Sequence, residues 1–116
     1  MVAPATKIMI VDDEPDIVNS LQHFLLLHGF EVDCAPCAEK ALQMLKKKEV
    51  DIVLLDMMMP GLHGAKAASL IKERYPRIKI VVITAYPAAT GYIEDTEGIK
   101  DYLEKPFKLE ALLAKL

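Results

Sequence analysis

The chain has 116 residues, 53% of them hydrophobic and 27% charged, which is typical of one globular domain that buries a core without disulfides or a structural metal. Its net charge of −3 gives no basis for binding nucleic acid, which requires a basic surface. No apolar segment approaches the roughly 18 residues that cross a bilayer, and the N-terminus lacks the features of a secretory signal. Two cysteines are too few for a disulfide framework, so we expect a cytoplasmic protein.

Short apolar runs alternate along the chain with segments whose apolar residues recur every three to four positions. In chain order these predict a strand at 7–11, a helix at 15–29, a strand at 30–35, a helix at 38–48, a strand at 51–57, a helix at 64–76, a strand at 78–85, a strand at 101–105 and a helix at 108–116. Pro15 suits the first turn of the first helix, and Gly29 suits its C-terminal end.

This alternation predicts an α/β fold, a doubly wound parallel sheet of five strands covered by helices on both faces. Residues 87–98 are the exception. Their place in the alternation requires a fourth helix, but Pro87, Gly91 and Gly98 oppose one. We therefore expect an irregular or shortened fourth helix.

Polar residues follow four of the predicted strands. Asp12 and Asp13 follow the first strand, Asp56 the third, Thr84 the fourth and Lys105 the fifth. The carboxyl ends of parallel strands share one edge of the sheet, and ligands of such sheets bind there. We expect these side chains to lie close together, with Asp56 accessible at the open edge.

This set of side chains has a chemical logic. Three ionised carboxylates raise one another's pKa unless a cation is present. Mg²⁺ suits them best, because it takes one or two carboxylates together with water and phosphate oxygens. A lysine can hold a phosphate and a threonine hydroxyl can donate to it, while an aspartate beside the metal can form an acyl phosphate.

The motifs IMIVDDEP, DIVLLDMMMPGLHG, VVITAY and DYLEKPF together resemble the receiver domain of bacterial two-component response regulators. The match covers residues 7–116, after an N-terminal extension of residues 1–6. The resemblance implies a flavodoxin-like fold with strand order 2-1-3-4-5. It also implies a signalling switch that catalyses only its own phosphorylation and dephosphorylation, using Mg²⁺ or Mn²⁺. The implied partners are a sensor histidine kinase or phosphotransfer protein and a downstream output domain or effector, with homodimer formation on phosphorylation as a further option.

The resemblance also implies a role for each matching residue. Asp56 is the phosphoacceptor. The metal ligands are Asp12, Asp13, Asp56 and the backbone carbonyl of Met58, with Asp13 the more direct ligand and Asp12 acting through water.

The remaining roles concern the response to phosphorylation. Lys105 contacts the phosphoryl oxygens, Thr84 moves onto the phosphoryl group, and Tyr102 rotates inward behind it. The surface of residues 84–106 then changes to control an output.

The sequence departs from the family in three places. The segment between Thr84 and Lys105 is slightly short and its helix has lost its apolar pattern, which puts the usual output surface in doubt. Position 63 is a histidine. The last helix stops early at Leu116, so we expect this chain to be a piece of a longer response regulator.

Three alternatives stay open. The chain could be a degenerate receiver that binds partners without phosphorylation. The CAPC motif at 34–37 could be a redox centre, with a helix N-terminus lowering the pKa of Cys34. Asp12 and Asp13 could also cap the helix that begins near Pro15.

Overall fold

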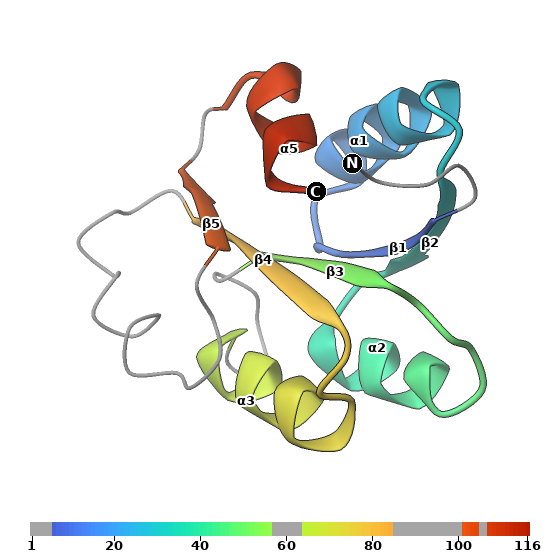
Figure 1. The fold of residues 1–116 in the computed structure, drawn as a ribbon, viewed down its shortest axis with the longest axis vertical. Coiled ribbons are helices and arrows are strands. Elements are labelled where there is room, and N and C mark those ends of the chain that lie inside the picture. The colour runs from blue at the N-terminus through green and yellow to red at the C-terminus, as the bar shows by residue number, and fades with distance from the viewer. Residues whose placement is uncertain (1–5, 57–63, 85–100, 105–106) are drawn as a thin grey trace.

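Strands and helices alternate in the order that the sequence predicts (Figure 1). The computed structural model describes residues 6–56, 64–84, 101–104 and 107–116, and the structural statements below concern these residues. The elements are β1 (Lys7–Val11), α1 (Pro15–Leu27), β2 (Glu31–Ala35), α2 (Ala38–Leu45), β3 (Ile52–Asp56), α3 (Gly64–Arg74), β4 (Lys79–Thr84), β5 (Asp101–Glu104) and α5 (Leu109–Lys115). The largest difference from the predicted bounds is at α2, which ends at Leu45 rather than at residue 48.

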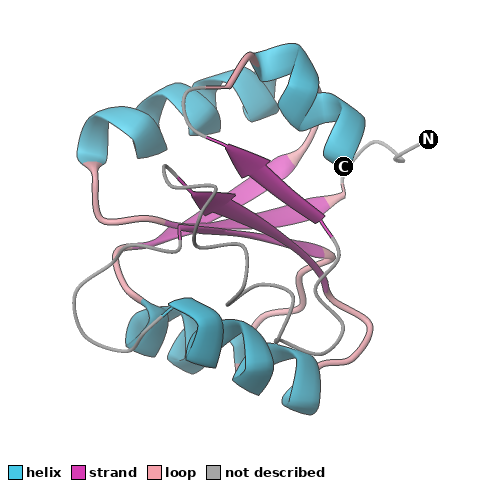
Figure 2. Cartoon of the chain, turned by 90° about the vertical axis from the view of Figure 1, so that its left-hand side faces the viewer, coloured by secondary structure: helices cyan, strands magenta, loops and turns pink. Residues whose placement is uncertain are grey.

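All five strands belong to one sheet of order β2-β1-β3-β4-β5, and every neighbouring pair is parallel. Helices α1 and α5 cover one face, and α2 and α3 cover the other (Figure 1). Figure 2 shows the sheet between these two layers. The predicted doubly wound, flavodoxin-like fold is therefore confirmed, while residues 87–98, where an irregular helix is expected, lie outside the described residues.

The central strands are buried on both faces because their side chains alternate between two apolar clusters. Along β3, Ile52 and Leu54 pack into the cluster under α1 and α5, and Val53 and Leu55 pack into the cluster under α2 and α3. Every residue of β3 is buried. The backbone of a polar residue at the end of such a strand is therefore fixed by the packing of the strand on both faces.

The end of α1 follows from its glycine. Gly29 has a φ of +88° and no Cβ to strain it, and its N–H donates to the carbonyl of Leu26 over 3.1 Å. The N–H of Phe30 donates to the carbonyl of Leu25 over 3.2 Å, which completes a Schellman motif. The predicted role of Gly29 is confirmed.

The longest described helix, α1, has 13 residues. Within the described ranges, no helix combines the length and the apolar character needed to cross a bilayer.

Candidate functional site

Three carboxylates gather at the C-terminal edge of the sheet. Val11 is paired with Leu55 in the β1–β3 register, so the next residues, Asp12 and Asp56, follow on adjacent strands. Oxygen atoms of Asp12, Asp13 and Asp56 all lie within 4.8 Å of one another. Among the residues that the structure describes, this is the one group of three or more potential metal-binding side chains.

The three carboxylates differ in exposure. Asp12 and Asp56 are each only 3% exposed, whereas Asp13 is exposed. The expectation of an accessible Asp56 is therefore wrong: it ends a fully buried strand and remains buried itself. Two buried carboxylates beside a third require a compensating positive charge or hydrogen bonds, since burial of ionised groups is costly.

Backbone hydrogen bonds fix Asp12 on both sides. Its Oδ1 accepts the N–H of Glu14 over 3.0 Å, and its own N–H donates to the carbonyl of Ala35 over 3.2 Å. The alternative in which Asp12 or Asp13 is the N-cap residue of α1 is wrong, because that residue is Glu14, which makes no side-chain cap bond. Asp12 instead closes the turn that leads into α1.

The donor set fits a hard divalent cation. It offers carboxylate oxygens only, close enough to share one ion, with an exposed member that leaves room for water. Mg²⁺ binds with such oxygens and keeps several waters, whereas zinc sites usually include histidine or cysteine.

The other expected site residues are only partly described. Thr84 ends β4, one position beyond Ile83, which is paired with Asp56. Tyr102 of β5 is paired with Val82 of β4. Both are therefore placed by the backbone alone. Their side chains lie outside the described part, as do Met58, His63 and Lys105.

A hollow that the sequence did not predict lies beside the acidic group. It measures about 240 Å³, and Asp12 and Asp13 form part of its wall. The rest of the wall is Pro15, Val18, Asn19, Cys34, Ala35 and Pro36. Its wall combines the start of α1, the end of β2 and the turn after β1, so it depends on how these elements pack and the sequence alone could not indicate it.

Cys34 does not form the redox centre considered above. It lies on β2 and not at a helix N-terminus; the N-cap residue of α2 is Cys37. Burial raises the pKa of the Cys34 thiol, and the nearby carboxylate of Asp33 raises it further. The alternative in which a helix N-terminus lowers the pKa of Cys34 is therefore wrong.

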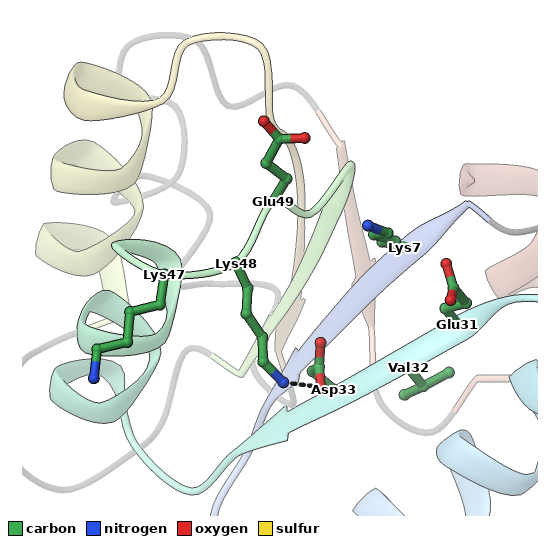
Figure 3. A pocket seen from close by; sticks show the side chains of 7 residues that line it. All are labelled: Lys7, Glu31, Val32, Asp33, Lys47, Lys48 and Glu49. Atoms are coloured by element: carbon green, nitrogen blue, oxygen red, sulfur yellow. Dashed lines mark hydrogen bonds and ion pairs between the residues drawn. The ribbon is translucent and has the colours of Figure 1, made fainter.

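A separate depression lies at the opposite, N-terminal edge of the sheet (Figure 3). Its volume is about 510 Å³, and charged residues of both signs line it. The Lys48 ammonium reaches Asp33 on β2 over 3.0 Å. This depression includes no group of metal-binding side chains among the described residues, so the acidic edge is the better candidate.

Comparisons with known proteins agree with this geometry. The family model of the response regulator receiver domain matches residues 8–116. The response regulator protein FleR of Pseudomonas aeruginosa is 37% identical over 110 residues, which are 94% of this chain and 23% of FleR. The chain thus spans about a quarter of that relative's length.

Solved structures show the same fold. The response regulator TrrA from Thermotoga maritima, in complex with Mg²⁺–BeF, has a TM-score of 0.85 and 32% identity, with 95% of each chain covered. The signal receiver domain of an HD domain-containing protein from Pseudomonas fluorescens has a TM-score of 0.89 and 28% identity, covering 95% of this chain and 90% of that one. Because the family model spans nearly all of the sequence, the chain belongs to the receiver domains of response regulators.

Proposed function

We propose that this receiver domain accepts a phosphoryl group on Asp56 in the presence of Mg²⁺. The observation that carries the proposal is the gathering of three carboxylates within 4.8 Å, two of them buried. Such a group is stable when a cation shares it, and the relative TrrA is a response regulator solved in complex with Mg²⁺–BeF.

The reaction uses an oxygen of Asp56 as the nucleophile. The oxygen attacks the phosphorus of a phosphohistidine, a P–O bond forms as the P–N bond breaks, and the imidazole leaves with its electron pair and gains a proton. The product is an acyl phosphate on Asp56. When bound, the divalent cation neutralises charge on the phosphoryl oxygens and on the carboxylates around them.

Asp12, Asp13 and Asp56 would hold the cation, together with the backbone carbonyl of Met58. The hydrogen bonds to Glu14 and Ala35 support this assignment, since they hold Asp12 in place within the group of three carboxylates. Mn²⁺ would serve in place of Mg²⁺ because it prefers the same oxygen ligands.

Three further residues would respond to the phosphoryl group. Lys105 would pair with its oxygens, Thr84 would donate its hydroxyl to it, and Tyr102 would rotate toward the space that Thr84 leaves. In the register of β3 and β4, Asp56 is paired with Ile83, and Thr84 is the next residue. This placement supports the role of Thr84 as a donor to the phosphoryl group.

We propose residues 7–116 as the domain and residues 1–6 as an extension. A sensor histidine kinase or phosphotransfer protein would donate the phosphoryl group, and an output domain or effector protein would read the change. The domain would catalyse only its own phosphorylation and dephosphorylation.

Incubation with acetyl phosphate and Mg²⁺ tests the proposal, followed by intact mass measurement and peptide mapping. We expect one phosphoryl group, confined to Asp56, and none in Asp56→Asn, which keeps the shape of the side chain. An unmodified wild-type chain would instead identify a degenerate receiver.

A further inference from the structure

A single residue links β2 to the N-cap of α2 beside the acidic site. Ala35 is the last residue of β2 and is only 1% exposed, and Cys37 is the N-cap residue of α2. Pro36 lies between them and is exposed. No step of the proposed phosphoryl transfer uses Pro36. The path of the chain at this corner depends on the backbone conformation of these few residues.

The corner holds one of the three carboxylate residues by a backbone hydrogen bond. In the sheet, Val11 is paired with Ala35, and the N–H of Asp12 donates to the carbonyl of Ala35 over 3.2 Å. This bond extends the pairing of β1 with β2 by one residue, to the first member of the acidic group. The direction of the Ala35 carbonyl is therefore part of what keeps Asp12 in place.

Side-chain packing restrains the corner on one side only. Ala35 and Ala38 pack into the cluster under α2 and α3. On another side lies the hollow of about 240 Å³, whose wall includes Asp12, Ala35 and Pro36. Because this hollow is open space, packing from that side does not hold the Ala35 carbonyl. The local backbone conformation has to do so.

The proline supplies such a restraint. Its ring disfavours the α region for the preceding residue and leaves it the extended region, which is the conformation of Ala35 in β2. The ring also fixes the φ of Pro36 itself. A rotation of Ala35 into the α region would turn its carbonyl away from the N–H of Asp12, because ψ sets the direction of the carbonyl. Pro36 thus disfavours the conformation in which this bond is broken.

We propose that Pro36 is a positioning residue of the cation site, which holds Asp12 in place through the carbonyl of Ala35. The inference rests on the proposed function, because Asp12 is one of the residues that would hold the cation. Groups that fix a metal-binding side chain raise the affinity for the metal, since a chain that is already ordered need not be ordered when the metal binds. Replacing Pro36 should therefore weaken Mg²⁺ binding without changing any side chain of the acidic group.

Pro36→Ala and Pro36→Gly test the inference, and Pro76→Ala is the matched control. Pro76 is also exposed, and it also follows a residue whose carbonyl accepts a backbone N–H, since the N–H of Ile78 donates to Tyr75 over 3.0 Å. It lies in the turn before β4, at the opposite edge of the sheet. A loss of stability that comes only from greater freedom of the unfolded chain appears in both alanine variants.

Two measurements distinguish positioning from a purely structural role. The first is amide hydrogen exchange by NMR, taken as the ratio of the rate at Asp12 to the rate at Ile10 in β1. This ratio should rise about two- to fivefold in Pro36→Ala, the factor that corresponds to the effect of one proline on backbone freedom. The second is Mg²⁺ affinity by calorimetry, which should fall about twofold in Pro36→Ala and further in Pro36→Gly, because glycine is the freer residue. Both quantities should keep their wild-type values in Pro76→Ala.

An exchange ratio that Pro36→Ala leaves unchanged overturns the inference. A raised ratio together with wild-type Mg²⁺ affinity in both Pro36 variants also overturns it, because Pro36 would then have a structural role alone. A raised ratio in a protein whose wild type binds no Mg²⁺ supports the hold of Pro36 on Asp12 and contradicts the proposed function instead.

Discussion

At the scale of single residues, the three carboxylates are not equivalent. Asp12 and Asp56 are buried at the ends of adjacent strands, and Asp13 is exposed in the turn that follows. The sequence could predict that they lie close together, because the ends of parallel strands share an edge. It could not predict the burial of Asp56, because exposure depends on neighbours that are distant in sequence.

Asp13→Ala should weaken Mg²⁺ binding about tenfold or more. Substituting a residue that only orients a metal ligand already lowers metal affinity by about 10–100-fold, and Asp13 is expected to be a ligand itself. Because Asp13 is exposed, the free energy of unfolding should change by less than about 0.5 kcal/mol. Calorimetric titration and thermal unfolding measure the two effects. Asp16→Ala, an exposed acid in the first turn of α1, is the control and should keep its Mg²⁺ affinity. Equal Mg²⁺ affinity of Asp13→Ala and wild type would show that Asp13 is not a ligand of the cation.

Cys34 predicts a dependence of stability on alkaline pH. Its thiol has a raised pKa in the folded chain, through burial and then through Asp33, so folding favours the neutral form. This contribution is complete below the pKa of an unfolded cysteine, about 8.5, and is lost as the pH rises through the higher folded value. Urea unfolding between about pH 7.5 and 10 should show that loss in wild type and in Cys37→Ser, and a smaller one in Cys34→Ser. Equal losses in all three would exclude Cys34 as the cause.

At the scale of elements, the buried strands were the easiest to predict and the helix ends the hardest. Apolar runs define β1, β3 and β4 because both faces of these strands are covered. The lysines after Leu45 have good helix propensity, yet α2 ends there because the chain must return toward β3. Lys48 is paired with Asp33 on β2, and Val50 is buried. Such tertiary contacts override local propensity.

Asp51 joins three strands at the edge of the sheet opposite the acidic site. Its carboxylate accepts the N–H of Lys7 over 2.8 Å, its N–H donates to the Lys7 carbonyl over 2.8 Å, and its carbonyl accepts the N–H of Lys79 over 3.0 Å. Only the first of these bonds needs the side chain. Asp51 thus helps to set the register that carries Asp56 to the other edge.

Asp51→Ala should therefore lower the free energy of unfolding by about 1 kcal/mol, the net worth of one hydrogen bond. Urea denaturation measures the change. Asp51→Asn keeps an acceptor oxygen and should lose less, and Glu49→Ala, which removes an exposed carboxylate nearby, should change the value by less than about 0.5 kcal/mol. An Asp51→Ala variant as stable as Glu49→Ala would show that the bond to Lys7 contributes nothing.

At the scale of the whole molecule, the chain is a receiver domain whose sheet brings residues from distant parts of the sequence to one edge. The order of strands and the parallel pairing could be predicted, since alternating elements with right-handed crossovers leave few topologies. The segment 87–98 could not be assigned from sequence, because its proline, glycines and threonines oppose the helix that the alternation requires. It lies outside the described residues.

We predict that phosphorylation reduces amide hydrogen exchange in residues 87–98. The segment follows Thr84 directly and has weak helix propensity, so a phosphoryl group that engages Thr84 should bias its conformation. Exchange measured by mass spectrometry with and without beryllofluoride and Mg²⁺ tests this, with α1 as an internal reference. Equal exchange in both states would place the response elsewhere.

We propose that Asp12, Asp13 and Asp56 form one cation site around a reactive carboxylate. A crystal structure of the chain grown with Mg²⁺ and beryllofluoride tests it most directly. We expect beryllium bound to an oxygen of Asp56, with Mg²⁺ contacted by Asp13 and Asp56 and reached from Asp12 through water. Beryllofluoride absent from Asp56, or Mg²⁺ bound away from these three carboxylates, would contradict it.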